Sequence, residues 1–181
     1  VNTFDEEDLQ LLKEANLEKV CIGIESGNDY IRNEIMKKGI SREAIFDAFV
    51  LFHKYEIFVS TQNIIGVPHE TATYFLDTVR LNAEIKPNNS FISIYHPYPG
   101  TKLYDLCIEE KLLVSQQEPF PERTKTILNM PYFSPEKIQF YYKNFKTLIQ
   151  YEQKRSMYPE MFPMPLTDKN AVGVVENILN H

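Results

Sequence analysis

Apolar and polar residues alternate along this chain with two different spacings. Runs rich in apolar residues at 20–24, 57–65 and 91–95 predict strands, and the first run stops abruptly at Glu25-Ser26-Gly27. This run predicts a strand buried on both faces, as in parallel sheets. The segments between the runs are far too long for hairpins, so the strands need crossover connections and form a parallel sheet.

Apolar residues at helical spacing predict helices between and after these strands. Expected N-caps are Asp5, Ser41, Ser134 and either Thr71 or Thr73, and Asn16 and Gly39 are expected stops. Pro119 and Pro121 predict an irregular stretch, and the prolines between 157 and 165 predict another. The expected helices cover about 5–15, a short segment ending near Lys38, 41–55, 71–85, 101–113, 134–155 and 171–180.

The order of these elements predicts an α/β fold. We expect a partial (β/α) TIM-type barrel of about three parallel strands with covering helices in residues 1–113. A C-terminal helical extension and tail should follow in residues 114–181. No internal repeat is present.

Charge and cysteine content narrow the classes of function. Nineteen Lys and Arg against twenty-five Asp and Glu give a net charge of −6, which weighs against binding nucleic acid. No apolar run is long enough for a membrane helix, and no signal peptide is evident, so we expect a cytoplasmic protein. The two cysteines, Cys21 and Cys107, predict reduced and mostly buried thiols rather than a disulfide or a metal site.

Candidate chemistry lies after each predicted strand, where barrels build their active sites. The three segments are Glu25-Ser26-Gly27, 66–71 and 96–101, each with a glycine and hydrogen-bonding side chains. The glycines could serve only tight turns, and Glu25 could be either a solvated loop acid or a ligand of hydroxyl groups. His69 and His96 fit surface or packed imidazoles better than metal ligands, so no metal site is assigned.

The same segments resemble a known enzyme family. Cys21 to Gly27, then Ile64 to Thr71, then Tyr98 to Tyr104 closely resemble the later strands of radical SAM enzymes, over about residues 5–112. The likeness is greatest to the branch whose members often carry a cobalamin-binding domain. Each motif alone is weak, but three in the right order make the resemblance strong.

The resemblance implies a six-stranded partial barrel in which a three-cysteine loop holds a [4Fe-4S] cluster and S-adenosylmethionine binds its fourth iron. This sequence contains neither that loop nor the Gly-Gly-Glu segment that would bind the methionine amino group. We therefore expect a truncated C-terminal half of a radical SAM enzyme, of the iron-sulfur oxidoreductase or methyltransferase type, that is inactive alone. S-adenosylmethionine and the [4Fe-4S] cluster are expected in the intact parent, where cobalamin is a further candidate. None of these cofactors is expected on the fragment.

The resemblance also assigns roles to residues. Glu25 and Ser26 would bind the ribose hydroxyls, Ile64, Ile65 and Gly66 would form the adenine shelf, and Tyr95, His96 and Pro97 would close over the adenine. The sequence departs from the usual G-x-I-x-G-x-x-E spacing, with Gln62 at the first glycine position and the acid, Glu70, one place late.

Two other readings stay open. The chain could be a non-catalytic barrel half that serves as an interaction module, or, less well supported, an aldolase-like barrel enzyme, although no lysine stands at a predicted strand end. For the truncated radical SAM half, the expected partners are the missing N-terminal half of the parent chain or a second copy bound through the exposed edge of the first strand.

Overall fold

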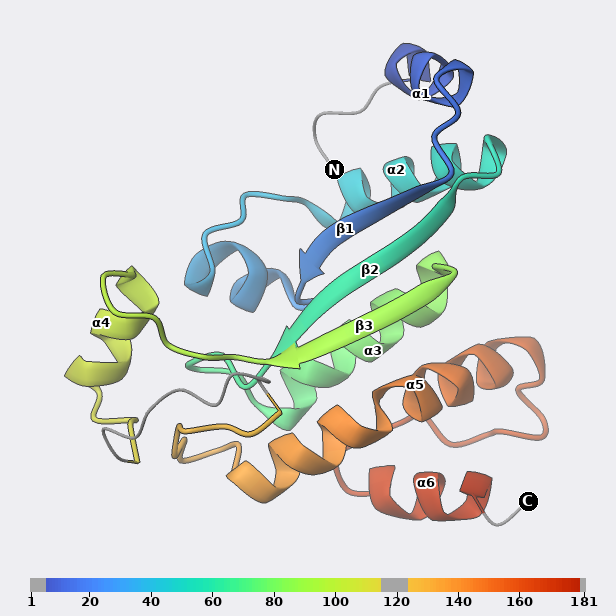
Figure 1. Ribbon diagram of the computed structural model, residues 1–181. Coiled ribbons are helices and arrows are strands. Elements are labelled where there is room, and N and C mark those ends of the chain that lie inside the picture. The colour runs from blue at the N-terminus through green and yellow to red at the C-terminus, as the bar shows by residue number, and fades with distance from the viewer. Residues whose placement is uncertain (1–5, 115–123, 180–181) are drawn as a thin grey trace.

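The computed structural model describes residues 6–114 and 124–179, and its centre is a parallel three-stranded sheet (Figure 1). The strands are β1 (Lys19–Glu25), β2 (Phe58–Ile65) and β3 (Asn89–Ile94), and they lie in the order β1-β2-β3. Helical crossovers join them, η1 and α2 before β2 and α3 before β3. The predicted α/β fold with three parallel strands and covering helices is confirmed.

The strand register places the carboxyl ends of all three strands at one edge of the sheet. β1 pairs with β2 from Lys19 opposite Phe58, and β2 pairs with β3 up to Ile65 opposite Ile94. A bulge lies near the end of β1, so that Glu25 stands opposite Asn63. The segments that follow the strands therefore meet at this edge.

The helices follow the predicted pattern closely. Serine and threonine hydroxyls cap four of them by accepting a hydrogen bond from the amide three residues on, at Ser41, Thr71, Thr101 and Ser134. Asp5, Pro119, Pro121 and Asn180 lie outside the described residues. The helices are α1 (Glu6–Glu14), the π-helix η1 (Tyr30–Ile35), α2 (Arg42–Lys54), α3 (Ala72–Ile85), α4 (Lys102–Glu109), α5 (Pro135–Met157) and α6 (Ala171–Leu179).

The hydrophobic core lies on one face of the sheet. Figure 1 shows α2 and α3 behind the strands, α5 alongside β3, and α6 beside α5. One apolar cluster joins α1 and α2 to β1 and β2, around Phe49 and Phe52. A larger cluster joins α3 to the C-terminal extension, around Phe75, Phe133 and Phe145. The extension therefore shares its core with the sheet domain, and the proposed division at residue 113 stays a prediction.

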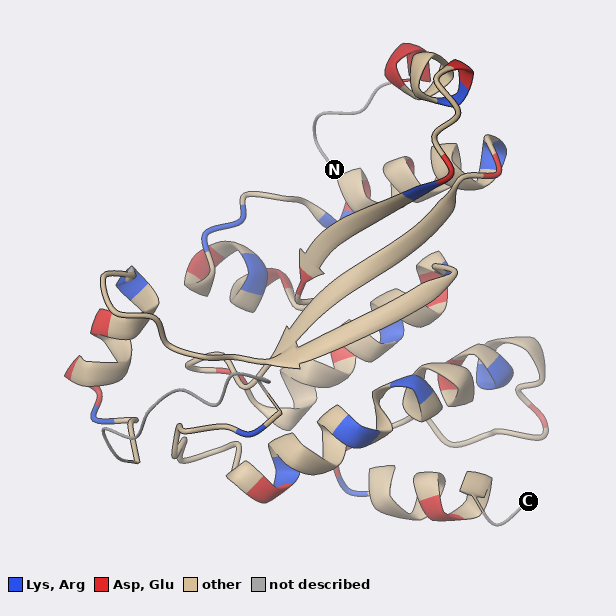
Figure 2. Ribbon diagram, viewed as in Figure 1, with Lys and Arg blue, Asp and Glu red and all other residues tan. Residues whose placement is uncertain are grey.

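The helices that the structure describes leave the opposite face of the sheet open. Cys21, Phe58 and Phe91 are exposed on it, the two phenylalanines by 40% and 44%. Within the three strands, charged residues occur only at the two ends of β1 (Figure 2), and the Lys146 ammonium of α5 lies 5.5 Å from the centroid of the Phe91 ring. The prediction that the first strand is buried on both faces is wrong, and so is the prediction of a buried Cys21. The reason is that the described helices cover only the face on which Ile22 and Ile24 lie.

None of the helices in residues 6–114 and 124–179 is long and apolar enough to cross a membrane.

Candidate functional site

Glu25 ends β1 with its carboxylate on the open face of the sheet. The bulge gives Glu25 a left-handed backbone, with φ of 66°. Its carboxylate folds back over Gly23, where a Cβ would come within 2.5 Å of Glu25 Oε1. The Lys38 ammonium donates to the same oxygen at 2.9 Å, and the Glu25 side chain is only 15% exposed. Glycine at position 23 thus leaves the space that the carboxylate occupies.

Ser26 lies on the other side of the chain, inside the protein. Its fully buried hydroxyl lies 3.5 Å from Thr78 Oγ1 on α3, and accepts from the amide of Asn28 at 3.2 Å. Its carbonyl accepts from the guanidinium of Arg32 at 2.9 Å. The structure therefore separates the two residues predicted to bind ribose, because one side chain points to the open face and the other to α3.

Gly27 explains why the loop after β1 can approach α3 so closely. Its amide donates to Thr78 Oγ1 at 2.8 Å, and a Cβ would lie 2.5 Å from the Thr78 Cα and still nearer the Asp77 carbonyl oxygen. The glycine here serves close backbone packing. Arg32, which the sequence did not single out, holds the same loop: it is fully buried and also donates to the Ile40 carbonyl at 2.8 Å.

The end of β2 places its apolar residues on different faces. Ile65 is fully buried in the core, whereas Ile64 is half-buried and faces the open side. Gly66 has φ of +82°, a conformation that disfavours other residues, and its amide donates to Glu70 Oε2 at 2.6 Å. Glu70 thus closes the turn that follows the strand.

The Glu70 carboxyl is 1% exposed, and its second oxygen has no hydrogen-bond partner. Burial raises the pKa of Glu70 to about 8, against the opposing effect of the amides of Gly66 and Val67. At neutral pH this carboxyl is mostly protonated and uncharged.

The end of β3 lies directly beside that of β2. The amide of Tyr95 donates to the Ile65 carbonyl at 2.7 Å, which continues the ladder. The Tyr95 hydroxyl is buried without a hydrogen-bond partner, and burial beside Cys107 raises the pKa of this phenol. His96 is half-buried with its ring edge-on to Tyr98 at 5.1 Å, and Pro97 is buried.

The structure therefore brings some of the predicted site residues together and leaves others apart. Residues 64–66 and 95–97 are neighbours across β2 and β3, whereas Glu25 reaches the same edge from β1, on the far side of β2. No group of three His, Cys, Asp or Glu in the described residues could hold a metal ion. Cys21 lies in β1 and Cys107 in α4, where burial raises the pKa of the Cys107 thiol to about 11.

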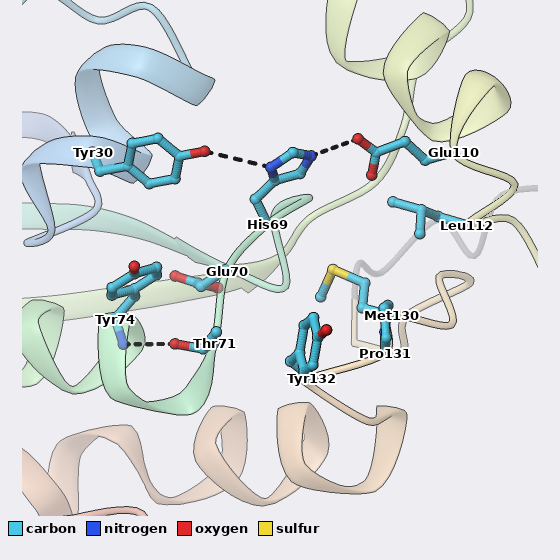
Figure 3. A pocket seen from close by; sticks show the side chains of 10 residues that line it. All are labelled: Tyr30, His69, Glu70, Thr71, Tyr74, Glu110, Leu112, Met130, Pro131 and Tyr132. Atoms are coloured by element: carbon cyan, nitrogen blue, oxygen red, sulfur yellow. Dashed lines mark hydrogen bonds and ion pairs between the residues drawn. The ribbon is translucent and has the colours of Figure 1, made fainter.

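A pocket beside this edge was not predicted from the sequence. It lies between η1, the loop after β2, the end of α4 and residues 130–132 (Figure 3). The sequence predicts a surface or packed imidazole at His69, and the structure places this exposed side chain between Tyr30 and Glu110. A sequence gives no direct signal for such a pocket, because its residues come from four separate segments.

Comparisons with known proteins agree with the strand-end motifs. The sequence profile of the Radical SAM superfamily matches residues 1–81. An uncharacterized methyltransferase of Pyrococcus horikoshii is 29% identical over 138 residues, which cover 76% of this chain and 30% of that protein.

Two further relatives are named for the transfer of a methylthio group. A protein of Methanocaldococcus jannaschii that is provisionally named a methylthiotransferase is 36% identical over 122 residues, 65% of this chain and 27% of its own. The tRNA-2-methylthio-N(6)-dimethylallyladenosine synthase of Sulfurihydrogenibium sp. is 29% identical over 133 residues, 70% of this chain and 29% of its own. The chain thus spans about 30% of the length of these relatives. The resemblance to radical SAM enzymes that its motifs predicted is confirmed by the superfamily match over residues 1–81 and by these relatives.

Proposed function

We propose that this chain is the C-terminal part of a radical SAM enzyme of the methyl- or methylthio-transferring type. In this proposal its strand ends supply the ribose and adenine side of the S-adenosylmethionine site. The observation that supports it most directly is the Glu25 carboxylate, held by Lys38 over Gly23 on the open face of the sheet. The names of the relatives support the reaction class.

Each strand end would do a different part of the binding. The Glu25 carboxylate would accept hydrogen bonds from the ribose hydroxyls, since carboxylates form strong charge-assisted bonds. Ile64 would offer an apolar surface to the adenine, and Gly66, whose positive φ turns the chain at the end of the strand, would end this shelf. Ser26 would act only by position, because its hydroxyl points to Thr78.

The residues of this chain do not fit an iron-sulfur cluster. Such clusters need three or four cysteine thiolates near one another. Here one cysteine lies on a strand and the other is buried in a helix with its pKa raised to about 11. We expect no stoichiometric cluster after anaerobic reconstitution with iron and sulfide. Iron analysis and visible absorption would check this, and one cluster per chain would contradict it.

Binding of nucleosides tests the proposed half-site. By saturation-transfer NMR, adenosine should bind this chain weakly, well above the micromolar range, because a partial site must still offset the full cost of immobilising its ligand. Glu25→Gln should weaken adenosine but not 2′,3′-dideoxyadenosine, which lacks both hydroxyls. Glu34→Gln, on the exposed surface of η1, is the matched control.

Two outcomes would contradict the assignment. Equal effects of Glu25→Gln on both nucleosides would remove the ribose role, and no adenosine binding at millimolar concentration would remove the half-site. Micromolar binding of S-adenosylmethionine would show that more of the site is present than we propose. If the chain is part of a longer protein, a three-cysteine loop should precede Val1 within about a hundred residues, from the usual size of barrel repeats.

A further inference from the structure

The pocket beside the strand ends has a volume of about 370 Å³, enough for a small molecule (Figure 3). None of the residues assigned above to the nucleoside lines it. Its ten lining residues are Tyr30, His69, Glu70, Thr71, Tyr74, Glu110, Leu112, Met130, Pro131 and Tyr132.

A histidine and a carboxylate form one rim of the pocket. His69 has a left-handed backbone, with φ of 68°, at the turn after β2. This turn places its imidazole between two partners: Nε2 lies 2.7 Å from Glu110 Oε1, and Nδ1 lies 3.4 Å from the Tyr30 hydroxyl. Glu110 is thereby held at the mouth of the pocket with its side chain 38% exposed.

Aromatic and apolar side chains form the walls. The rings of Tyr30 and Tyr74 meet at a tilt of 55° with their centroids 6.1 Å apart. On the other side Leu112, Met130 and Tyr132 line the pocket (Figure 3). Tyr132 is 80% exposed, so its ring is accessible to a molecule that enters the pocket.

Glu70 supplies an unpaired polar group among these residues. One carboxyl oxygen accepts from the Gly66 amide, and the other is buried with no hydrogen-bond partner. Buried polar groups nearly always have partners, so an orphan that lines a pocket indicates a ligand that could complete it.

The charges of the lining restrict that ligand. Two carboxyl groups and one imidazole line the pocket, together with three phenols, and none of the described residues that line it is a Lys or Arg. Glu70 is mostly uncharged at neutral pH, so a phosphate or carboxylate would meet the Glu110 carboxylate with no Lys or Arg of the described lining beside it. A compact organic cation would meet aromatic faces, which attract cations within about 6 Å, and the Glu110 carboxylate.

From this geometry we propose that the pocket binds a small organic cation, an alkylammonium group with a compact apolar body. The ammonium group lies over the tyrosine rings and near Glu110, and the apolar body contacts Leu112 and Met130. This site is separate from the proposed nucleoside half-site, so each can fail without the other.

Three probes of one shape and different charge test the proposal. Choline is the cation, 3,3-dimethylbutan-1-ol its neutral counterpart and 3,3-dimethylbutanoate an anion of similar size. Met130 lines the pocket, and the protein has four other methionines that do not, so methyl NMR of ¹³C-methionine protein gives one reporter and four internal references. Choline should shift the Met130 signal selectively, with a millimolar Kd, about tenfold tighter than the alcohol, and the anion should not bind.

Two variants locate the cation. Tyr132→Leu and Glu110→Gln should each weaken choline by about threefold or more, and both positions are exposed enough to tolerate the change. Tyr158→Leu, at an exposed tyrosine outside the pocket, should leave choline binding unchanged. Equal binding of choline and the alcohol, binding of the anion, equal shifts at all five methionines, or no effect of either variant would overturn the proposal.

Discussion

At the scale of single residues, several polar side chains are buried where they fix the backbone. Glu70 closes the turn after β2, Arg32 holds the loop after β1, and Gly27 allows that loop to contact α3. These residues surround the strand ends but do not point to the open face. Their roles are therefore to position the edge of the sheet rather than to bind a ligand of that face.

Glu70 should make the stability of the protein depend on pH. Its folded pKa of about 8 lies above the ordinary 4.5, so the folded state binds the extra proton between these values. The contribution of Glu70 to the free energy of unfolding is therefore complete below about pH 4.5. As the pH rises through 8 this contribution is lost, and the free energy of unfolding falls by up to about 1.4 kcal/mol per pH unit. Glu70→Gln, which stays neutral, should flatten this fall and match or exceed the parent Tm at pH 8.

Thermal melts from pH 5 to 8.5 check this expectation. Glu109→Gln, on the exposed surface of α4, is the control and should keep the parent slope. Parallel curves for the parent and Glu70→Gln would mean that Glu70 is ionised in the folded protein.

Glycine 27 should be intolerant of even one added methyl group. In Gly27→Ala the new Cβ would overlap the backbone of α3, which cannot move like a side chain. We expect a loss of about 1–3 kcal/mol in the free energy of unfolding, measured by urea denaturation. Gly173→Ala in α6 is the matched control, because a Cβ there meets nothing and should stabilise the helix by up to about 1 kcal/mol. Equal effects of the two substitutions would refute the packing argument.

At the scale of elements, a buried polar network joins α3 to the sheet. Asn82 accepts from the hydroxyls of Thr61 and Ser90 at 2.7 and 3.1 Å, and its amide donates to Asn63 at 2.9 Å. All four residues are buried. A fully satisfied network of this kind fixes how a helix sits on a sheet, whereas apolar contacts alone allow several arrangements.

Replacement of Asn82 by leucine should lower the free energy of unfolding more than the same replacement of an exposed asparagine. Asn82→Leu removes the acceptor of the Thr61 and Ser90 hydroxyls and the donor to the Asn63 side-chain oxygen. A buried polar atom left unsatisfied costs about 1–3 kcal/mol. We expect a loss of at least about 2 kcal/mol by urea denaturation, and little change for Asn177→Leu on the exposed side of α6. A cost below about 1 kcal/mol would indicate that water enters and satisfies the orphaned groups.

The elements themselves could largely be predicted from the sequence, since helices and strands depend on local spacing and caps. Ser41 and Ser134 cap helices as expected, and Asn16 stops α1 with a left-handed backbone. The short helix after Gly27 differs, because it is a π-turn held by Arg32 and ends at Ile35 rather than near Lys38. Its geometry depends on contacts made with residues further along the chain.

What could not be predicted depends on which surfaces are covered. The frequent burial of free cysteines predicts a buried Cys21, and the apolar run around it predicts a strand buried on both faces. Burial of both faces needs a second layer, and the described residues provide only one. The site was predicted as a set of strand ends, and the structure separates Glu25 from Ser26 through a bulge that no sequence motif marks. The pocket at His69 joins four distant segments, and only the fold brings them together.

At the scale of the whole molecule, the residues that the structure describes leave one edge and one face of the sheet without cover. β1 is an edge strand of the described sheet, while α5 packs beside β3 at the other edge (Figure 1). The open face exposes Cys21, Phe58 and Phe91 around a hollow of about 610 Å³. The tail could have folded over β1, but α6 packs against α5 instead.

This arrangement leads us to expect that the chain self-associates through β1 and the open face. An uncovered edge strand offers unpaired backbone groups to another chain, and exposed aromatic residues add apolar surface to the contact. Light scattering after gel filtration should therefore show a species larger than a monomer, in a proportion that rises with protein concentration.

A single charged substitution should distinguish association through β1 from non-specific association. Cys21→Lys places a cation on the edge strand at an exposed position, where natural edge strands often carry lysine to prevent pairing, and should shift the protein to a monomer. Val172→Lys, at an exposed apolar residue of α6, changes the net charge equally and should leave the oligomer intact. Association in the presence of reducing agent excludes a disulfide through Cys21 as its cause. A parent chain that is monomeric at all concentrations, or an equal response of both lysine variants, would show that β1 is not the contact.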